Sequence, residues 1–226
     1  MHLVLVHGAG GAAATWDLVT PLLAGLGCKL TAVTNPLQSL EGDVAHTLAV
    51  IDSIPGDIVL VGHSYGGAVI TNAGRHSRVR GLVYIAAFGP DAGESVDSIV
   101  AEYPPAESEA FASQNGSGEW ITDRSGTYWD EIGPDLSPEQ RVAMLAETRK
   151  CEEDVFVQES GKPAWRGLPT WYLLATADRN LRPEVQRFMA ERMSARIVKV
   201  DSSHFTPRSA PLSIARLVET AVTALR

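Results

Sequence analysis

Short apolar segments recur along the chain and alternate with segments of helical periodicity. The apolar segments are Leu3–Val6, Leu30–Val33, Ile58–Val61, Gly81–Ala86, Thr170–Ala175 and Arg196–Val200. Mostly apolar runs of this length are typical of strands that are covered on both faces. Their alternation with helices indicates an α/β fold, which we expect to be a mostly parallel six-stranded sheet with helices on both faces.

Apolar residues three and four positions apart mark the helices that should cover this sheet. In one segment the apolar residues recur at helical spacing, as Val185, Phe188, Met189 and Met193. These segments lie between predicted strands or after the last one, where the crossover connections of a parallel sheet are needed. The predicted helices are Thr15–Leu26, Asp43–Ser53, Tyr65–Gly74, Arg182–Met193 and Pro211–Leu225.

The alternation of strands and helices stops after Phe88. The following segment is rich in proline, glycine and acidic residues, and within it only Leu136–Lys150 has a helical pattern, with a serine N-cap and a proline after it. We expect residues 1–88 and 166–226 to form the core and residues 89–165 to form a cap inserted over the sheet. A long surface insertion without a role is the alternative, although structureless loops of this length are uncommon.

The first chemical signal is Gly62-His63-Ser64-Tyr65-Gly66, which matches the G-x-S-x-G pattern of a nucleophile elbow. The pattern alone is weak, but here a predicted strand precedes it and a predicted helix follows it, as the elbow requires. The glycines let the chain turn sharply and leave the serine exposed. A helix N-terminus also places N–H groups beside developing negative charge. We therefore expect Ser64 to be a nucleophile and the Tyr65 N–H to be an oxyanion donor.

A serine nucleophile needs a histidine base, and hydrolases of this kind place it last in the order serine, acid, histidine. His76 lies at the far end of the helix that begins beside Ser64, over ~15 Å away at 1.5 Å per residue. His204 follows the last predicted strand, at the sheet edge where α/β proteins build their sites. We expect His204 to be the base.

The acid must orient the imidazole of the base and stabilise its cation. Asp178 follows the predicted strand Thr170–Ala175, again at a carboxyl strand end. Asp201 and Asp91 are rivals, and capping of the next helix is the alternative role for Asp178. We expect Asp178 to complete the triad.

The glycine-rich segment His7–Ala13 follows the first predicted strand. Its G-x-G-x-x-A spacing is also compatible with dinucleotide binding, which would make the chain an oxidoreductase. That function needs an acidic residue at the end of the next strand, and Thr31–Pro36 contains none. In a hydrolase the same loop supplies the second oxyanion N–H, which we expect from Ala9.

Composition and charge limit the classes of partner and the compartment that we expect for this protein. The net charge of −8 argues against nucleic acid, because no basic footprint is present. Two cysteines, Cys28 and Cys151, form no disulfide framework or C-x-x-C pair. No stretch has the length and apolarity of a membrane span, and the first residues do not resemble a signal peptide. We expect a cytoplasmic protein, either a monomer or a homodimer, that does not associate with membranes.

Several segments taken together resemble one known group, the small α/β hydrolases similar to plant methylesterases and hydroxynitrile lyases, with their bacterial esterase-like members. The segments are Leu5–Ala9, Val61–Ile70, Val83–Phe88 and Arg182–Met189. The resemblance implies the α/β-hydrolase fold. It also implies the roles given above: Ser64, Asp178 and His204 as catalytic triad, and Ala9 and Tyr65 as oxyanion hole. It implies no cofactor and no metal.

Two positions favour ester hydrolysis within this group. The lyases typically have threonine where Gly8 stands and lysine where Phe205 follows the base. Without that lysine a leaving cyanide has no cationic partner. We expect a serine esterase acting on a small or medium-sized organic molecule. The alternatives are a lyase or cyclase using the same triad and a ligand receptor with little turnover.

Aromatic residues of the predicted cap could line an apolar substrate pocket, and packing within the cap is the alternative role for each. They are Tyr103, Phe111, Trp120, Tyr128, Trp129 and Phe156. The loop after His7 departs from the group pattern, because small residues stand where bulky aromatics are usual. The substrate-binding residues therefore stay unknown at this point.

Overall fold

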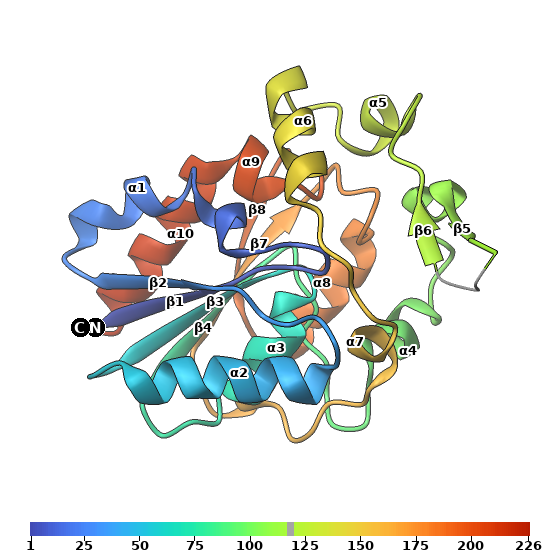
Figure 1. Ribbon diagram of the computed structural model, residues 1–226. Helices are drawn as coiled ribbons and strands as arrows, with labels where there is room; N and C mark the ends of the chain where they lie inside the picture. The colour runs from blue at the N-terminus through green and yellow to red at the C-terminus, as the bar shows by residue number, and fades with distance from the viewer. Residues whose placement is uncertain (117–119) are drawn as a thin grey trace.

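The computed structural model describes residues 1–116 and 120–226, except the side chain of Trp120, and its centre is one parallel sheet (Figure 1). The strands are β1 (His2–Val6), β2 (Lys29–Val33), β3 (Ile58–His63), β4 (Val79–Ile85), β7 (Thr170–Ala175) and β8 (Arg196–Val200). Their order is β2-β1-β3-β4-β7-β8, and every neighbouring pair is parallel. The predicted mostly parallel six-stranded sheet is confirmed.

Helices cover both faces of the sheet and bury alternate strand residues in two core layers. Leu3 and Leu5 point into the layer under α10 (Pro211–Ala224) and α1 (Thr20–Leu23). Val4 and Val6 point into the opposite layer, under α2 (Leu40–Ser53), α3 (Gly66–Ala73) and α8 (Pro183–Arg192). Each fully buried aliphatic side chain contributes roughly 1.5–3 kcal/mol of transfer free energy, so two-sided burial explains the apolar runs of β1, β3, β4 and β7. The expectation of two covered faces is wrong for β2 and β8, whose residues are mostly half-buried or exposed because these strands form the edges of the sheet.

One predicted helix differs from the structure. In place of a continuous helix over Thr15–Leu26, the chain forms η1 (Ala13–Trp16), the single turn α1 and η2 (Ala24–Leu26). Pro21 lacks the N–H that would continue a helix from the preceding turn, so α1 starts beside it. Gly27 then takes φ 64°, a left-handed conformation that ends the segment.

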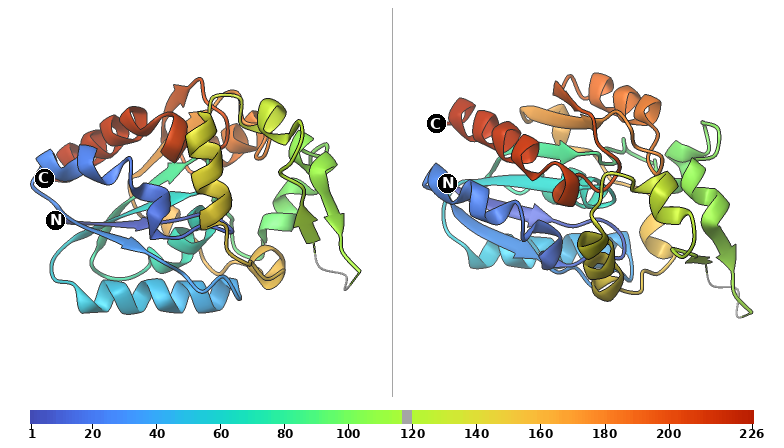
Figure 2. Two further views of the ribbon diagram at one scale, coloured as in Figure 1. Left: turned by 45° about the horizontal axis from the view of Figure 1, so that its top comes forward. Right: turned by 90° about the horizontal axis from the view of Figure 1, so that it is seen from above.

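The segment between β4 and β7 leaves the sheet and lies across the carboxyl ends of the strands (Figures 1 and 2). Its helix α6 agrees with the predicted one and has the capping box between Ser137 and Gln140. Both ends of the segment pack into the α3 layer of the core, through Val96 and Trp165 among others. The elements are α4 (Val96–Val100), η3 (Glu107–Phe111), β5 (Ala112–Gln114), β6 (Trp120–Thr122), α5 (Tyr128–Ile132), α6 (Pro138–Glu147), α7 (Asp154–Val157) and η4 (Ala164–Arg166). We refer to residues 89–165 as the cap, and their role as an inserted lid with these boundaries stays a prediction.

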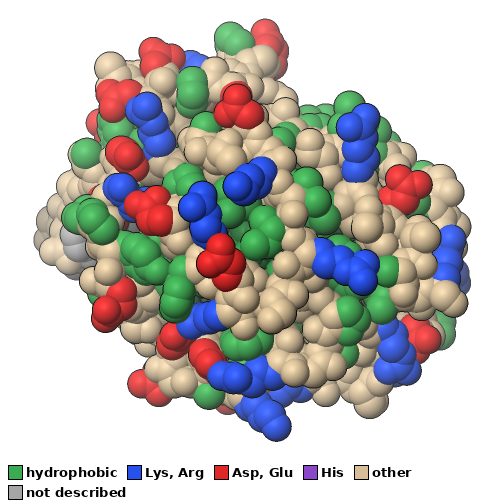
Figure 3. Space-filling view, turned by 180° about the vertical axis from the view of Figure 1, so that it is seen from behind, with side chains coloured by type: hydrophobic (Ala, Val, Ile, Leu, Met, Phe, Trp, Pro, Cys, Tyr) green, Lys and Arg blue, Asp and Glu red, His purple; other side chains and the backbone are tan. Residues whose placement is uncertain are grey.

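The surface of the molecule carries charges of both signs. On the face seen in Figure 3, basic and acidic side chains lie interspersed, and no continuous basic field covers it. Within residues 1–116 and 120–226, no helix combines the length and apolarity that a membrane crossing needs.

Candidate active site

Ser64 occupies a sharp turn between β3 and α3, with φ at 53°. This left-handed conformation costs a non-glycine residue about 1–2 kcal/mol, so the surrounding backbone must hold it. Its N–H donates to the Ile85 carbonyl at 3.2 Å, and its carbonyl accepts from Gly67 at 2.9 Å and from Phe88 at 3.1 Å. The end of β4 and the start of α3 therefore fix the serine from both sides.

Three glycines make the turn possible. A Cβ atom at Gly62 would lie 2.6 Å from the Gly66 carbonyl oxygen, and one at Gly66 would lie 2.5 Å from that of Val6. At Gly67 it would lie 2.2 Å from the Phe88 carbonyl oxygen. These obstacles are backbone atoms that cannot turn aside, so the turn accepts no larger residue. The pentapeptide pattern includes the first two glycines and misses Gly67.

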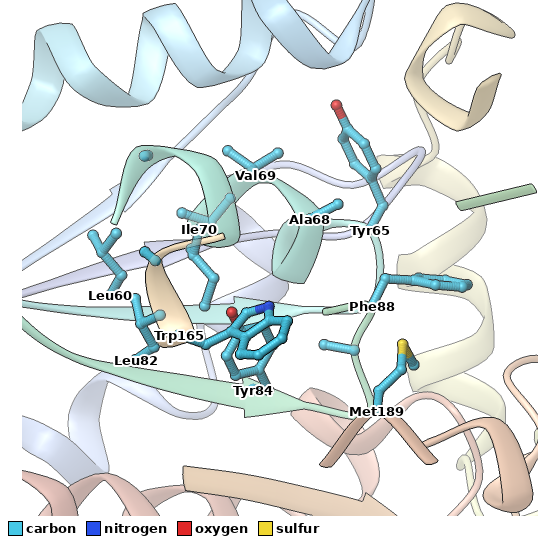
Figure 4. Packing of buried hydrophobic residues seen from close by; sticks show 14 of the residues in the cluster. Leu60, Tyr65, Ala68, Val69, Ile70, Leu82, Tyr84, Phe88, Trp165 and Met189 are labelled. Atoms are coloured by element: carbon cyan, nitrogen blue, oxygen red, sulfur yellow. The ribbon is translucent and has the colours of Figure 1, made fainter. Parts of the chain in front are cut away.

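The helix behind the nucleophile, α3, is buried along its whole length, and its side chains pack in one cluster with residues of β3, β4 and η4 (Figure 4). Its N-cap residue Tyr65 is anchored through its hydroxyl, which donates to Asp43 at 2.9 Å. Asp43 also accepts from the Leu37 N–H at 2.8 Å, and burial raises the pKa of this carboxyl group. The residue that follows Ser64 is therefore tied to the first turn of α2.

The three residues predicted to form a triad lie in one hydrogen-bonded row. Asp178 follows β7 and His204 follows β8, and both side chains are buried. The Asp178 carboxylate accepts from His204 Nδ1 at 2.7 Å. His204 Nε2 therefore carries the lone pair and accepts from the Ser64 hydroxyl at 2.9 Å. This geometry suits proton removal from a serine nucleophile.

The rival residues lie elsewhere. His76 hydrogen-bonds to Asp52 at 3.1 Å, at the far end of α3. Asp91 pairs with Arg166. Asp201 is exposed to solvent. None of the three rivals enters the row that joins Ser64 to Asp178.

The Asp178 carboxylate has its full set of hydrogen-bond donors. Oδ1 accepts from the Asn180 and Leu181 N–H groups at 2.7 and 2.8 Å. Oδ2 accepts from Gln186 Nε2 at 2.8 Å as well as from His204. Four donors satisfy the oxygens of this buried carboxylate and leave them little freedom to move. Gln186 was not singled out in the sequence, where it is one polar residue in a helical pattern.

His63, the residue before the nucleophile, supports the base from the other side. Its Nε2–H donates to the His204 carbonyl at 2.9 Å, and the centres of the two rings are 5.0 Å apart. Burial, and then the neighbouring imidazole, lower the pKa of His63 to about 3, so the ring is neutral in ordinary buffers. The variable second position of G-x-S-x-G gave no sign of this contact.

The predicted oxyanion donors lie on the two segments that face the serine. In the described part of the chain no acceptor takes the N–H of Ala9 or Tyr65. The loop carrying Ala9 passes so close that a Cβ at Gly8 would lie 2.8 Å from the Ser64 Cβ. Two free N–H groups beside a nucleophile are what a tetrahedral oxyanion requires, and their assignment to that task stays a prediction.

His7 shapes this loop. Its Nε2 accepts from the Asn35 N–H at 3.0 Å, so its Nδ1–H donates to the Gly8 carbonyl at 2.7 Å. Burial lowers the pKa of His7 to about 4, which keeps the ring in this neutral form.

The cap holds the same loop through Arg149. The Arg149 N–H donates to the Gly10 carbonyl at 2.9 Å. Its guanidinium Nη1 donates to the carbonyls of Gly11 at 3.1 Å and Asn35 at 2.8 Å. The return segment of the cap therefore fixes the backbone that carries the candidate oxyanion donor.

A second cap residue, Asp135, holds the loop of the base. Its Oδ2 accepts from the Ser203 N–H at 2.8 Å and from the Ser202 hydroxyl at 3.2 Å. Residues 149 and 135 were not singled out in the sequence, because each acts on backbone far away along the chain.

Aromatic rings of the cap extend from the base outward. Trp129 lies 5.6 Å from Phe205, whose ring lies 6.1 Å from that of His204. Tyr128 and Phe111 continue this cluster, whereas Tyr103 packs on Phe188 and Phe156 on Tyr65. The side chain of Trp120 lies outside the described residues. In the part of the chain that the structure covers, no group of three potential metal ligands gathers.

The two buried histidines predict acid sensitivity. Because folding lowers the pKa of His7 to about 4 and of His63 to about 3, the unfolded chain binds extra protons below pH 6.5. Their contribution to stability is therefore complete above pH 6.5 and is lost as the pH falls toward 4. We expect Tm, measured by circular dichroism, to fall over this range.

A variant at position 63 tests this expectation. His63→Gln, which keeps an N–H donor and does not titrate, should make the fall in Tm shallower. His46→Gln, at an exposed position on α2, should not, and an identical slope in both variants would contradict the assignment.

Comparisons with known proteins agree with this architecture. A family model described as the alpha/beta hydrolase family matches residues 3–217. Methylesterase 2 from Arabidopsis thaliana is 26% identical over 87% of this chain and 86% of its own length. A carbendazim hydrolyzing esterase from Nocardioides sp. (strain SG-4G) is 35% identical over 48% of this chain and 51% of its own. The crystal structure of a pyrethroid hydrolase matches with a TM-score of 0.86 at 22% identity, over 99% of this chain and 98% of that one.

The resemblance to plant methylesterases that the sequence suggested is confirmed by the first of these relatives. The family model spans nearly the whole chain, and the six-stranded sheet is parallel throughout. The protein belongs to the alpha/beta hydrolase family.

Proposed function

We propose that this protein is a serine esterase that hydrolyses a carboxylic ester of a small or medium-sized organic molecule. The observation that carries the proposal is the row Ser64–His204–Asp178, with hydrogen bonds of 2.9 and 2.7 Å in the orientation that proton transfer requires. The names of the relatives, a methylesterase and a carbendazim hydrolyzing esterase, support the same chemistry.

The reaction would proceed by two acyl transfers. Ser64 Oγ attacks the ester carbonyl carbon while His204 Nε2 takes its proton, and the carbonyl oxygen becomes an oxyanion that the N–H groups of Ala9 and Tyr65 receive. His204 then gives the proton to the leaving alcohol. Water repeats the sequence on the acyl-enzyme, which releases the acid and restores Ser64.

Two features support an apolar ester over a cyanohydrin. Phe205, which follows the base, packs against Trp129 in the cap, so its position offers no positive charge to a leaving cyanide. The rings next to His204 are apolar and suit a hydrocarbon group of the substrate.

The cysteines bear on the cellular compartment. Cys28 and Cys151 are both free thiols. This agrees with a reducing compartment, and we propose the cytoplasm.

An active-site probe tests the proposal directly. A fluorophosphonate should modify the purified protein on Ser64, located by peptide mapping, and p-nitrophenyl esters of increasing acyl length should be hydrolysed until the probe has reacted. A mandelonitrile cleavage assay runs beside the ester panel. Modification of another residue would overturn the proposal, and so would cyanohydrin cleavage without ester hydrolysis.

A further inference from the structure

A fully buried glutamine lies behind the candidate acid. Gln186 is on α8 with none of its surface exposed, between the core residues Val185 and Met189. Burial of an amide is strongly unfavourable unless its hydrogen bonds are made. The side chain therefore needs a complete set of partners at this place.

Gln186 has that set, and its partners all belong to the segment that carries Asp178. Oε1 accepts from the N–H of Ala175, the last residue of β7, at 3.0 Å. Nε2 donates to Asp178 Oδ2 at 2.8 Å and to the Leu181 carbonyl at 2.7 Å. One amide thus links the strand end, the acid and Leu181, which lies two residues before α8.

The orientation of this amide follows from its partners. The Ala175 N–H can face only an acceptor, so Oε1 must lie on that side. The NH₂ group then faces Asp178 Oδ2, the same oxygen that accepts from His204. Two backbone N–H groups hold Oδ1, and the glutamine fixes the second oxygen, so that the plane of the carboxylate is set.

We propose that Gln186 is a positioning residue, which holds Asp178 Oδ2 in line with His204 Nδ1 so that Nε2 stays aimed at Ser64. This inference rests on the proposed serine mechanism. Gln186 touches neither the nucleophile nor the oxyanion donors, so it acts on the reaction only through the acid. Its loss should therefore lower the rate of acylation and leave substrate binding nearly unchanged.

The titratable groups that face the acid and base from neighbouring elements include an imidazole, two phenols and one cap carboxylate. His63 faces His204 from β3, and burial lowers its pKa to about 3. Tyr128 on α5 and Tyr172 on β7 face Asp178, and burial raises the pKa of both phenols. Asp135 from the cap is next to the base loop, where it binds the Ser203 N–H. A titrating group introduced at position 186 should therefore add a pH dependence of its own.

Three variants test the proposal. Gln186→Met removes every hydrogen bond and keeps the volume close. Gln186→Glu keeps the shape and, while protonated, one O–H donor for Asp178 and one acceptor for the Ala175 N–H. Gln158→Glu makes the same chemical change where the side chain only accepts from the N–H of Glu41 on α2. The measurements are kcat and KM for p-nitrophenyl butyrate, the rate of Ser64 phosphonylation, and Tm.

Gln186→Met should lower kcat and the phosphonylation rate by about 10- to 100-fold, with KM within about twofold, because misplacement by a fraction of an ångström is felt mainly in the chemical step. Burial beside Asp178 raises the pKa of the carboxyl introduced by Gln186→Glu. The activity of that variant relative to the unmodified enzyme should be greatest near pH 6 and fall toward pH 9. The activity of Gln158→Glu relative to the unmodified enzyme should stay constant over the same pH range. Circular dichroism at each pH confirms that the variants remain folded.

A further readout reports on the hydrogen bond between His204 and Asp178 itself. The Nδ1 proton of His204, bonded to Asp178, should give a downfield proton NMR resonance that shifts or broadens in Gln186→Met. An unchanged resonance, parental kcat in Gln186→Met, or a pH-independent ratio in Gln186→Glu would each overturn the positioning role. Failure of the probe to label Ser64 in the unmodified enzyme would instead overturn the proposed function, and the resonance would still decide the role of Gln186.

Discussion

Replacing Ser64 with alanine should lower kcat/KM for p-nitrophenyl esters by about four orders of magnitude or more. The hydroxyl is the only atom group in the row that can form the acyl bond, and His204 Nε2 accepts from it at 2.9 Å. Removal of a triad serine leaves only the rate enhancement that the oxyanion donors and substrate binding supply. Stability should change little, because the backbone hydrogen bonds that hold φ at 53° do not involve the hydroxyl.

The measurement is ester hydrolysis by Ser64→Ala, with Tm recorded beside it. Ser77→Ala, at an exposed serine in the turn after α3, is the matched control and should keep the full rate. Fluorophosphonate labelling should disappear in the first variant and persist in the second. Turnover that survives Ser64→Ala at the parental level would mean that another group attacks the ester.

The strands and the site could be predicted from the sequence for one shared physical reason. A strand covered on both faces must be apolar along its length, so its end is visible where polar residues begin. Ser64 and Asp178 each follow such an end, and His204 follows the partly exposed edge strand β8. Parallel strands bring their carboxyl ends to one edge of the sheet, so three distant positions could be expected to meet there.

The supporting residues could not be predicted, because their roles depend on contacts distant in sequence. His63 binds a carbonyl 141 positions away, and Arg149 binds one 138 positions away. Gln186 is polar within an amphipathic helix, and such a residue ordinarily faces solvent. In the folded chain Gln186 is fully buried, because α8 packs against β7.

The cap was predicted only as a region, for a different reason. Apart from α6, its elements are short helices and a small hairpin, too brief to give a periodic signal. They are stabilised largely by tertiary contacts, such as the packing of Tyr128, Trp129 and Phe205. Arg149 and Asp135 link the cap to the loop of the candidate oxyanion donor Ala9 and to the loop that carries His204, so a rearrangement of the cap would move both loops.

The second large effect is expected for Asp178→Asn, which should lower kcat by about 10⁴-fold while the protein stays folded. The two backbone N–H groups at Oδ1 require an acceptor there, so the introduced amide places its oxygen at that site. Its NH₂ then faces His204 and donates to Nδ1. The imidazole is forced to carry its proton on Nε2, where it can no longer accept the proton of Ser64.

Asp201→Asn is the control, because this exposed aspartate lies in the loop of the base and was the nearest rival in the sequence. It should retain activity within about twofold. Nitrogen NMR of labelled histidine should show the tautomer of His204 reversed only in Asp178→Asn. The opposite ranking of the two variants would assign the acid to Asp201. A loss of activity in Asp178→Asn without tautomer reversal would show that the carboxylate acts by its charge alone. The position of the His204 ring proton therefore distinguishes two roles of Asp178, orienting the base and stabilising its cation.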